Sequence, residues 1–157
     1  MFSKLINKSH KILFGLVALA LVMASPSFAG LKYSTTLKNA RLDAITTAAG
    51  ANAKLSVYSG TQPAACGTAT TQLVQLPMNA TFAPAASGGV LTLNSITTTN
   101  ASATGTATWM RVWKNDGTTC VMDGDVSTSG AALNLSSTAI TSGQPVSVTS
   151  FVITAGN

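Results

Sequence analysis

The stretch from Gly105 to Asp125 reads GTATWMRVWKNDGTTCVMDGD, and it decides the fold predicted for this chain. From Ala107 to Trp113 the largest side chains recur at every second position, which is the signature of a β-strand. Asn115–Gly117 tolerates positive φ and predicts a turn, after which Cys120–Met122 returns as the partner strand. Asp123–Asp125 is then predicted to turn the chain again. The stretch therefore predicts a central hairpin that carries the largest side chains of the core.

The first strand of this hairpin has two faces, and one of them must face the core. Trp109 and Trp113 share a face with Arg111 between them, whereas Met110 and Val112 point to the other side. We call the side of Trp109, Arg111 and Trp113 the tryptophan face. Because a buried tryptophan contributes more area than any other residue, we expect the tryptophan face to be the core face.

Arg111 complicates this prediction, because a guanidinium cannot be buried without a partner. It can lie near the sheet edge and stack on an indole, or it can pair with Asp123 or Asp125 across the hairpin. Alternatively, the whole face is exposed and forms an interface, or stacks on a sugar or a base. Trp109, Arg111 and Trp113 are therefore the candidate interface or ligand surface.

The first 29 residues carry the three-part pattern of a secretory signal peptide. Met1–Lys11 contains three lysines and no acid, Ile12–Ala24 is an apolar run of thirteen residues, and small residues stand at Ser27 and Ala29. A membrane-spanning helix needs about 20 apolar residues, so a retained anchor is the weaker alternative. We expect cleavage after Ala29, which leaves residues 30–157 as one secreted or periplasmic domain.

The composition of residues 30–157 excludes several classes of protein. The whole chain has nine basic and four acidic residues, but Lys4, Lys8 and Lys11 belong to the leader. The mature net charge is then about +2, which gives no reason to expect nucleic-acid binding. The only histidine, His10, is also in the leader, and the chain has no glutamate. The usual Ser-His-Asp and Cys-His arrangements are absent, so we expect no catalytic residues, no cofactor and no metal.

Two groups of residues allow more than one interpretation. Asp123-Gly124-Asp125 offers oxygen ligands for calcium, but it lacks the further acids of a dedicated site, and a tight turn is preferred. Cys66 and Cys120 lack the spacing and the histidines of a zinc site. In an exported chain an even cysteine count indicates a disulfide, with two buried thiols as the alternative. Its loop of about 55 residues would stabilise the fold by roughly 4 kcal/mol.

One helix and a series of short strands are expected after the leader. The helix lies within Leu31–Ala49, capped by Ser34 or Thr35 and ended by Gly50, and it should pack on a sheet or on a neighbouring subunit. Outside the hairpin, strands are predicted at Lys54–Tyr58, Leu73–Met78, Val90–Ile96, Ala131–Leu135 and Pro145–Thr154. Short strands separated by turns predict a mostly β single domain, a β-sandwich or jelly roll with one N-terminal α-helix.

Four segments of the chain resemble a family of small proteins encoded in tailed bacteriophages and prophages. They are LKNARLDAITTAAGANAKLSVYSGTQPA at 37–64, TFAPAASGGVLTLNSITT at 81–98, ATGTATWMRV at 103–112 and DGDVSTSGAALNLSSTAITSGQPVSVTSFVITAGN at 123–157. They occur in order and cover nearly the whole mature chain. The resemblance implies a non-enzymatic, virion-associated structural β protein of the head-decoration or tail- or fibre-associated type.

The leader and the two cysteines distinguish this chain from that family, whose members usually begin just before the helix. An export signal together with a disulfide suggests a copy adapted to the periplasm or the cell exterior. We expect an exported assembly subunit that forms homo-oligomers or binds other virion or surface proteins, and that contacts the membrane only through its signal peptide during export. The virion is the alternative location. A pilin-like or fibre subunit and an exported carbohydrate- or surface-binding module are the alternative functions.

Overall fold

The computed structural model describes residues 30–156, in which one helix is followed by eleven strands. The predicted signal peptide, residues 1–29, lies outside the described residues, as does Asn157. The elements are, in chain order, α1 (Thr35–Ala49), β1 (Lys54–Ser59), β2 (Thr71–Pro77), β3 (Val90–Thr92), β4 (Thr99–Asn100), β5 (Gly105–Thr106), β6 (Trp109–Trp113), β7 (Cys120–Ser127), β8 (Leu133–Leu135), β9 (Ala139–Ile140), β10 (Pro145–Val146) and β11 (Val148–Thr154). All of them belong to one unit that begins at Lys32.

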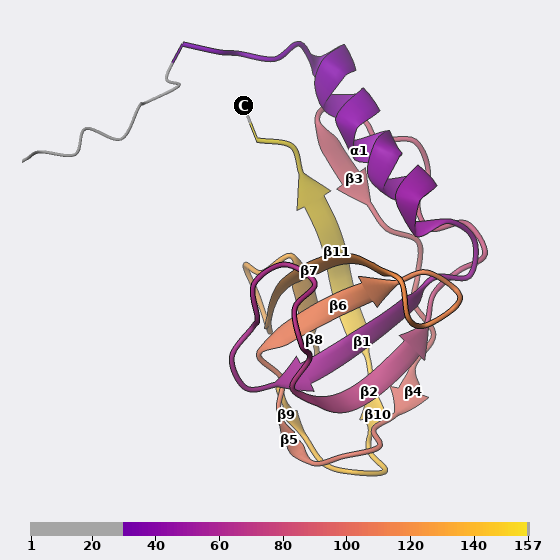
Figure 1. The fold of residues 1–157 in the computed structure, drawn as a ribbon, viewed down its shortest axis with the longest axis vertical. Coiled ribbons are helices and arrows are strands. Elements are labelled where there is room, and N and C mark those ends of the chain that lie inside the picture. The colour runs from indigo at the N-terminus through magenta and orange to yellow at the C-terminus, as the bar shows by residue number, and fades with distance from the viewer. Residues whose placement is uncertain (1–29, 157) are drawn as a thin grey trace, which may run out of the picture. The chain divides into compact units, whose positions relative to one another are not determined.

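Helix α1 begins and ends at the capping residues that the sequence offers. The Ser34 hydroxyl oxygen accepts a hydrogen bond from the Leu37 N–H over 3.2 Å. Gly50 follows the helix with a φ of 71°, which glycine adopts without strain. The helix packs on this chain's own fold beside β3 (Figure 1). There the side chains of Asn39 and Asp43 accept hydrogen bonds from backbone N–H groups of the segment that leads into β3.

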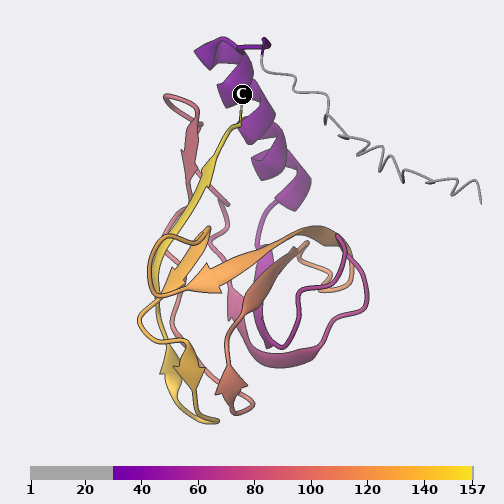
Figure 2. The ribbon, with the colours of Figure 1, turned by 90° about the vertical axis from the view of Figure 1, so that its left-hand side faces the viewer.

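Seven strands form one mixed sheet in the order β2-β1-β6-β7-β8-β11-β3. Neighbouring strands are antiparallel, except that β7 and β8 pair in parallel through two residues of each strand. Around β7 the sheet folds over, so that its β2-β1-β6 half faces β8 and β11 (Figure 2). Two further pairs of short strands, β10-β4 and β5-β9, complete the fold. The domain is thus mostly β and sandwich-like with one α-helix, as the sequence predicts.

Strand boundaries follow the sequence at one edge of the sheet and depart from it at the other. β2 is an edge strand and ends at Pro77, which suits a residue that cannot donate a hydrogen bond to a neighbouring strand. The strand predicted over Val90–Ile96 ends at Thr92. The last predicted strand is divided at Ser147 into β10 and β11.

β6 and β7 form the predicted central hairpin, with β1 on the other side of β6. The prediction that Asp123-Gly124-Asp125 forms a turn is wrong, because β7 continues through these residues to Ser127. Gly124 lies opposite Met110 in the register, and a Cβ atom on Gly124 would lie 2.6 Å from Met110 Cε. The glycine therefore makes room for a core methionine instead of ending the strand.

The main core lies on the Met110 and Val112 face of β6. Its buried apolar side chains come from both halves of the sheet and include Leu55, Val57, Leu76, Met110, Val112, Leu133, Leu135 and Phe151. The expectation that the tryptophan face is the core face is therefore corrected. Trp109 is fully buried, but it lies on the opposite side of the sheet, where the loop between β1 and β2 covers it.

Candidate functional site

The tryptophan face carries a row of aromatic rings with one cation among them. The Arg111 guanidinium carbon is 5.2 Å from the Trp109 ring centroid and 5.0 Å from the Trp113 ring centroid. The Tyr58 ring on β1 stacks on Trp109, with centroids 4.2 Å apart and an angle of 11° between the ring planes. Arg111 is therefore held by cation–π contacts with both indoles.

Arg111 also forms a bidentate ion pair with Asp123, its cross-strand neighbour on β7. Arg111 Nε lies 2.5 Å from Asp123 Oδ1, and Arg111 Nη2 lies 2.8 Å from Asp123 Oδ2. Both side chains are 2% exposed. Asp123 as a whole residue is half-buried, so its remaining exposure lies in its backbone. Arg111 thus pairs with Asp123 across the hairpin, as one of the predicted arrangements has it. It also stacks on both indoles, but β6 lies inside the sheet and not near its edge, so the position predicted for that stacking is wrong.

The pair shifts the pKa of both groups toward their charged forms. The hydrogen bond to Asp123 raises the pKa of Arg111, against the opposing effect of burial. Burial alone would raise the pKa of Asp123, but the hydrogen bonds from Arg111 and from the Cys66 N–H outweigh it, and this pKa lies below its usual value. Both partners are therefore ionised at neutral pH.

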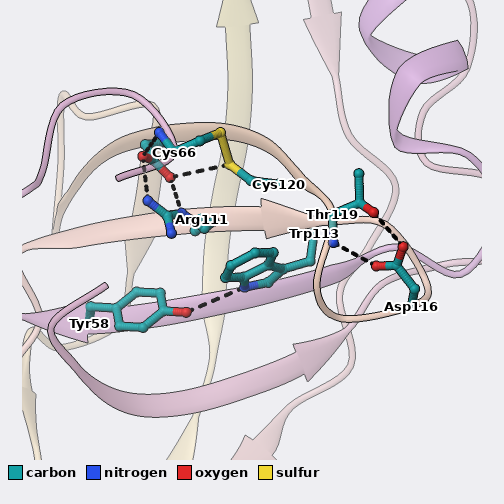
Figure 3. The surroundings of a disulfide bond; sticks show 8 residues. Tyr58, Cys66, Arg111, Trp113, Asp116, Thr119 and Cys120 are labelled. Carbon is teal, nitrogen blue, oxygen red and sulfur yellow. Dashed lines mark hydrogen bonds and ion pairs between the residues drawn. A yellow bond between two sulfur atoms is a disulfide. The ribbon is translucent and has the colours of Figure 1, made fainter. Parts of the chain in front are cut away.

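The predicted disulfide joins Cys66, in the loop between β1 and β2, to Cys120 at the start of β7, with their Cα atoms 5.8 Å apart (Figure 3). It lies directly beside the ion pair. The Cys66 N–H donates to Asp123 Oδ2 over 2.8 Å, and Cys120 Sγ lies 4.0 Å from Asp123 Oδ1. One carboxylate thus joins the loop, the disulfide and the strand β6 through Arg111.

Both ends of this loop, residues 60–70, are tied to the hairpin as well, and we call the segment the disulfide loop. The Thr108 hydroxyl donates to the Gly60 carbonyl oxygen. The Trp109 Nε1–H donates to Thr70 Oγ1 over 2.9 Å. The loop is therefore fixed at its two ends and in its middle, and it seals Trp109 and Arg111 from solvent.

Trp113 is the member of the tryptophan face that stays half-buried. Its Nε1–H donates to the Tyr58 hydroxyl oxygen over 3.3 Å (Figure 3). That hydroxyl donates to Gln72 Oε1 over 3.4 Å. Gln72 is exposed. A ligand or partner at this face would meet Trp113 and Gln72 first, and the function of the face as an interface or ligand surface stays a prediction.

Each of the four aspartates of the domain accepts hydrogen bonds that shape the fold. The pairs are Asp43 with the Ala86 N–H, Asp116 with Thr118 and Thr119, Asp123 with Arg111 and the Cys66 N–H, and Asp125 with the Ala132 N–H. At Asp116 the hydrogen bonds from the Thr119 hydroxyl and from the backbone hold the pKa well below its usual range. These carboxylates therefore hold turns, loops and strands in place.

A possible metal-binding group coincides with the disulfide. Cys66, Cys120 and Asp123 bring their donor atoms within 4.8 Å of one another, but the two sulfur atoms are bonded to each other and the carboxylate holds Arg111. The calcium alternative for Asp123-Gly124-Asp125 gains no support either, since Asp123 binds Arg111 and Asp125 accepts the Ala132 N–H.

Sequence reasoning missed Tyr58, Thr70 and Gln72, which complete the site. A signal for Tyr58 exists in the alternation of β1, where Leu55 and Val57 point into the main core and Tyr58 points away from it. Thr70 and Gln72 carry no such signal, because a loop residue and an exposed amide in a Thr- and Gln-rich segment match no motif.

Two recesses lie elsewhere on the described surface. One of about 250 Å³ is bounded by residues 92–96 and 148–151, and one of about 170 Å³ by α1 and residues 153–156. Within residues 30–156, no helix has the length and apolar character needed to cross a bilayer.

Comparison with known proteins gives no relative for this chain. No protein-family model matches the sequence, no curated protein is significantly similar to it, and no solved structure matches its fold. The resemblance to phage proteins stays a prediction.

Proposed function

We propose that this chain is an exported, non-enzymatic structural domain of phage or prophage origin that acts as an assembly subunit, in a virion or on the cell exterior. The observation that carries the proposal is the use of its charged groups. Every aspartate holds a backbone segment or the guanidinium of Arg111. A catalytic acid or base must be free to exchange a proton at the working pH, whereas these carboxylates are engaged in hydrogen bonds within the fold.

The disulfide supports the exported location. A bond between cysteines 54 positions apart persists in oxidising compartments and is rare in a reducing cytosol. It agrees with the leader pattern of residues 1–29, which predicts transfer to the periplasm or the exterior.

The N-terminal helix favours assembly by docking of folded domains. Donor-strand assembly needs an extended, alternating N-terminal strand, and α1 occupies Thr35–Ala49 instead. A low net charge also leaves little repulsion between copies. We therefore prefer the docking of folded copies, on each other or on a larger particle, to a pilin-like mechanism.

Three measurements test the proposal together: leader cleavage on export, the disulfide, and the size of the assembly. The full chain is expressed with its leader, recovered from the periplasm, and analysed by mass spectrometry of non-reduced peptides. We expect cleavage after Ala29, a Cys66–Cys120 peptide, and an oligomer of several chains by multi-angle light scattering. A strict monomer that also fails to sediment with virions or cells would contradict it.

One observation favours a second candidate, an exported carbohydrate-binding module. Half-buried Trp113 lies beside exposed Gln72, and an indole next to an amide is suited to stacking on a sugar while binding its hydroxyl groups. Glycan titration followed by the emission of Trp113 tests it, with Trp113→Phe as the control. No spectral change at millimolar glycan would remove this candidate.

A further inference from the structure

The start of the domain carries a compact group of basic, aromatic and apolar side chains. We call Lys32, Tyr33, Leu37 and Arg41 the α1 patch. Leu37 and Arg41 are one turn apart on the same side of the helix, and the Arg41 guanidinium carbon lies 5.1 Å from the Tyr33 ring centroid. Leu37 is 46% exposed and, with Leu31, is one of the two large hydrophobic side chains that are exposed within residues 30–156.

The charge of this segment is one-sided. Lys32, Lys38 and Arg41 lie within ten residues, and no acid precedes Asp43. Asp43 is half-buried, and its Oδ1 accepts the Ala86 N–H over 2.7 Å. The other three acids hold partners of their own: Asp116 accepts the Thr118 and Thr119 N–H groups, Asp123 pairs with Arg111, and Asp125 accepts the Ala132 N–H. The α1 patch therefore presents net positive charge to solvent.

A recess adjoins the patch on the side of Arg41. Its volume is about 170 Å³, and its wall includes half-buried Ile45 of α1 and Ile153 near the end of β11. The positively charged α1 patch thus borders a partly apolar recess. Basic residues, a tyrosine and an exposed leucine beside an apolar recess are the combination that suits the boundary between lipid headgroups and acyl chains.

We propose that the α1 patch docks on the anionic lipid surface of the membrane across which the chain is exported. The inference rests on the proposed export. The predicted leader ends at Ala29, so the patch begins three residues after the expected cleavage site and emerges next to the bilayer. The positive charge of the patch favours binding to anionic lipid headgroups. The exposed Leu37 side chain favours a surface that also offers apolar contacts, such as lipid acyl chains. This extends membrane contact beyond the leader.

Vesicle flotation with the purified, oxidised chain 30–157 tests the proposal. Each Lys or Arg near an anionic leaflet strengthens binding about fivefold. Because the patch holds two such cations, we expect binding to phosphatidylglycerol-containing vesicles to exceed binding to pure phosphatidylcholine vesicles by about 25-fold or more. Raising the salt to about 0.5 M should remove most of the difference, because it shortens the range of exposed charges.

Two double variants of equal charge locate the site. Lys32→Gln with Arg41→Gln should weaken binding about 25-fold. Lys54→Gln with Lys114→Gln should weaken it less than about threefold, because these two lysines lie at the turn between β6 and β7 and do not belong to the patch. Equal losses in the two variants, or equal binding to both vesicle types, would overturn the proposal.

The variant Leu37→Ser separates lipid from other polyanions. It should weaken binding several-fold, because a leucine inserted among lipid tails loses its apolar contact. Unchanged binding would assign the attraction to charge alone and overturn the lipid assignment. Vesicle binding does not require assembly, so a failure to bind vesicles would leave the proposed function standing. A failure of the proposed function would be seen instead in leader processing and in light scattering.

Discussion

Replacing the two partners of the buried ion pair, singly and together, gives the largest effects that the structure predicts. The variants are Arg111→Met, Asp123→Leu and the double variant. Methionine is long enough to fill the space between the two indoles and makes favourable contacts with aromatic rings. Leucine replaces the carboxylate with an apolar group of similar size.

The magnitude follows from the burial of the pair. Both side chains are 2% exposed, so solvent does not screen a charge that is left alone. Removing one partner of a buried pair costs about 3–5 kcal/mol, whereas replacing both by apolar groups is close to neutral. We expect each single variant to lose about 3–5 kcal/mol of unfolding free energy and the double variant to lie within about 2 kcal/mol of the parent.

Urea unfolding followed by circular dichroism measures these differences, with the disulfide intact in all four proteins. A domain of this size has a total stability of about 5–15 kcal/mol, so each single variant should shift the midpoint strongly. The double-mutant cycle should give a coupling energy of at least about 3 kcal/mol. Single losses below about 1 kcal/mol, or losses that add to within about 0.5 kcal/mol, would refute the reasoning.

Three further perturbations test the surroundings of the pair. Removing the disulfide with Cys66→Ser and Cys120→Ser should cost about 4 kcal/mol in urea unfolding, from a closed loop of about 55 residues; a loss below about 1 kcal/mol would mean that the loop constrains the unfolded chain little. Burial raises the pKa of Asp123, but the hydrogen bonds from Arg111 and the Cys66 N–H outweigh burial and lower this pKa below its usual value. The ionised carboxylate therefore stabilises the fold fully above the unfolded-state pKa of about 4. This stabilisation is lost as the pH falls through the lower folded-state pKa. Stability should therefore be level from pH 7 to about 5 and fall below about 4, and Asp123→Asn should flatten that fall; an equally steep fall in the variant would contradict this assignment. Thr70→Val leaves the Trp109 Nε1–H without its acceptor and should cost about 1–3 kcal/mol by thermal or urea unfolding, whereas an unchanged stability would show that water replaces the threonine.

The sequence predicts those parts of the fold that local chemistry controls. The bounds of α1 follow from Ser34 and Gly50, which supply the cap and the left-handed residue that a helix end needs. The central hairpin follows from alternating side chains around a turn of Asn, Asp and Gly. The disulfide follows from an even cysteine count in a chain with an export signal.

Features that depend on distant partners could not be predicted in the same way. Asp123-Gly124-Asp125 has the composition of a turn, yet Arg111, Met110 and the Ala132 N–H provide partners and space that keep it in β7. A period-two pattern also shows that a strand has two faces without showing what covers each of them. The tryptophan face is covered by the disulfide loop, whose position depends on Cys120, more than fifty residues further along the chain.

The seal of the disulfide loop over the tryptophan face is tested most directly by the fluorescence of Trp109. Trp113→Phe leaves Trp109 as the only tryptophan of the chain. Because Trp109 is fully buried and its Nε1–H is bound to Thr70, the oxidised protein should emit at a blue-shifted wavelength and be almost insensitive to iodide. Emission close to that of free indole, with strong quenching by iodide, would show that the face is open and would contradict the structure described above.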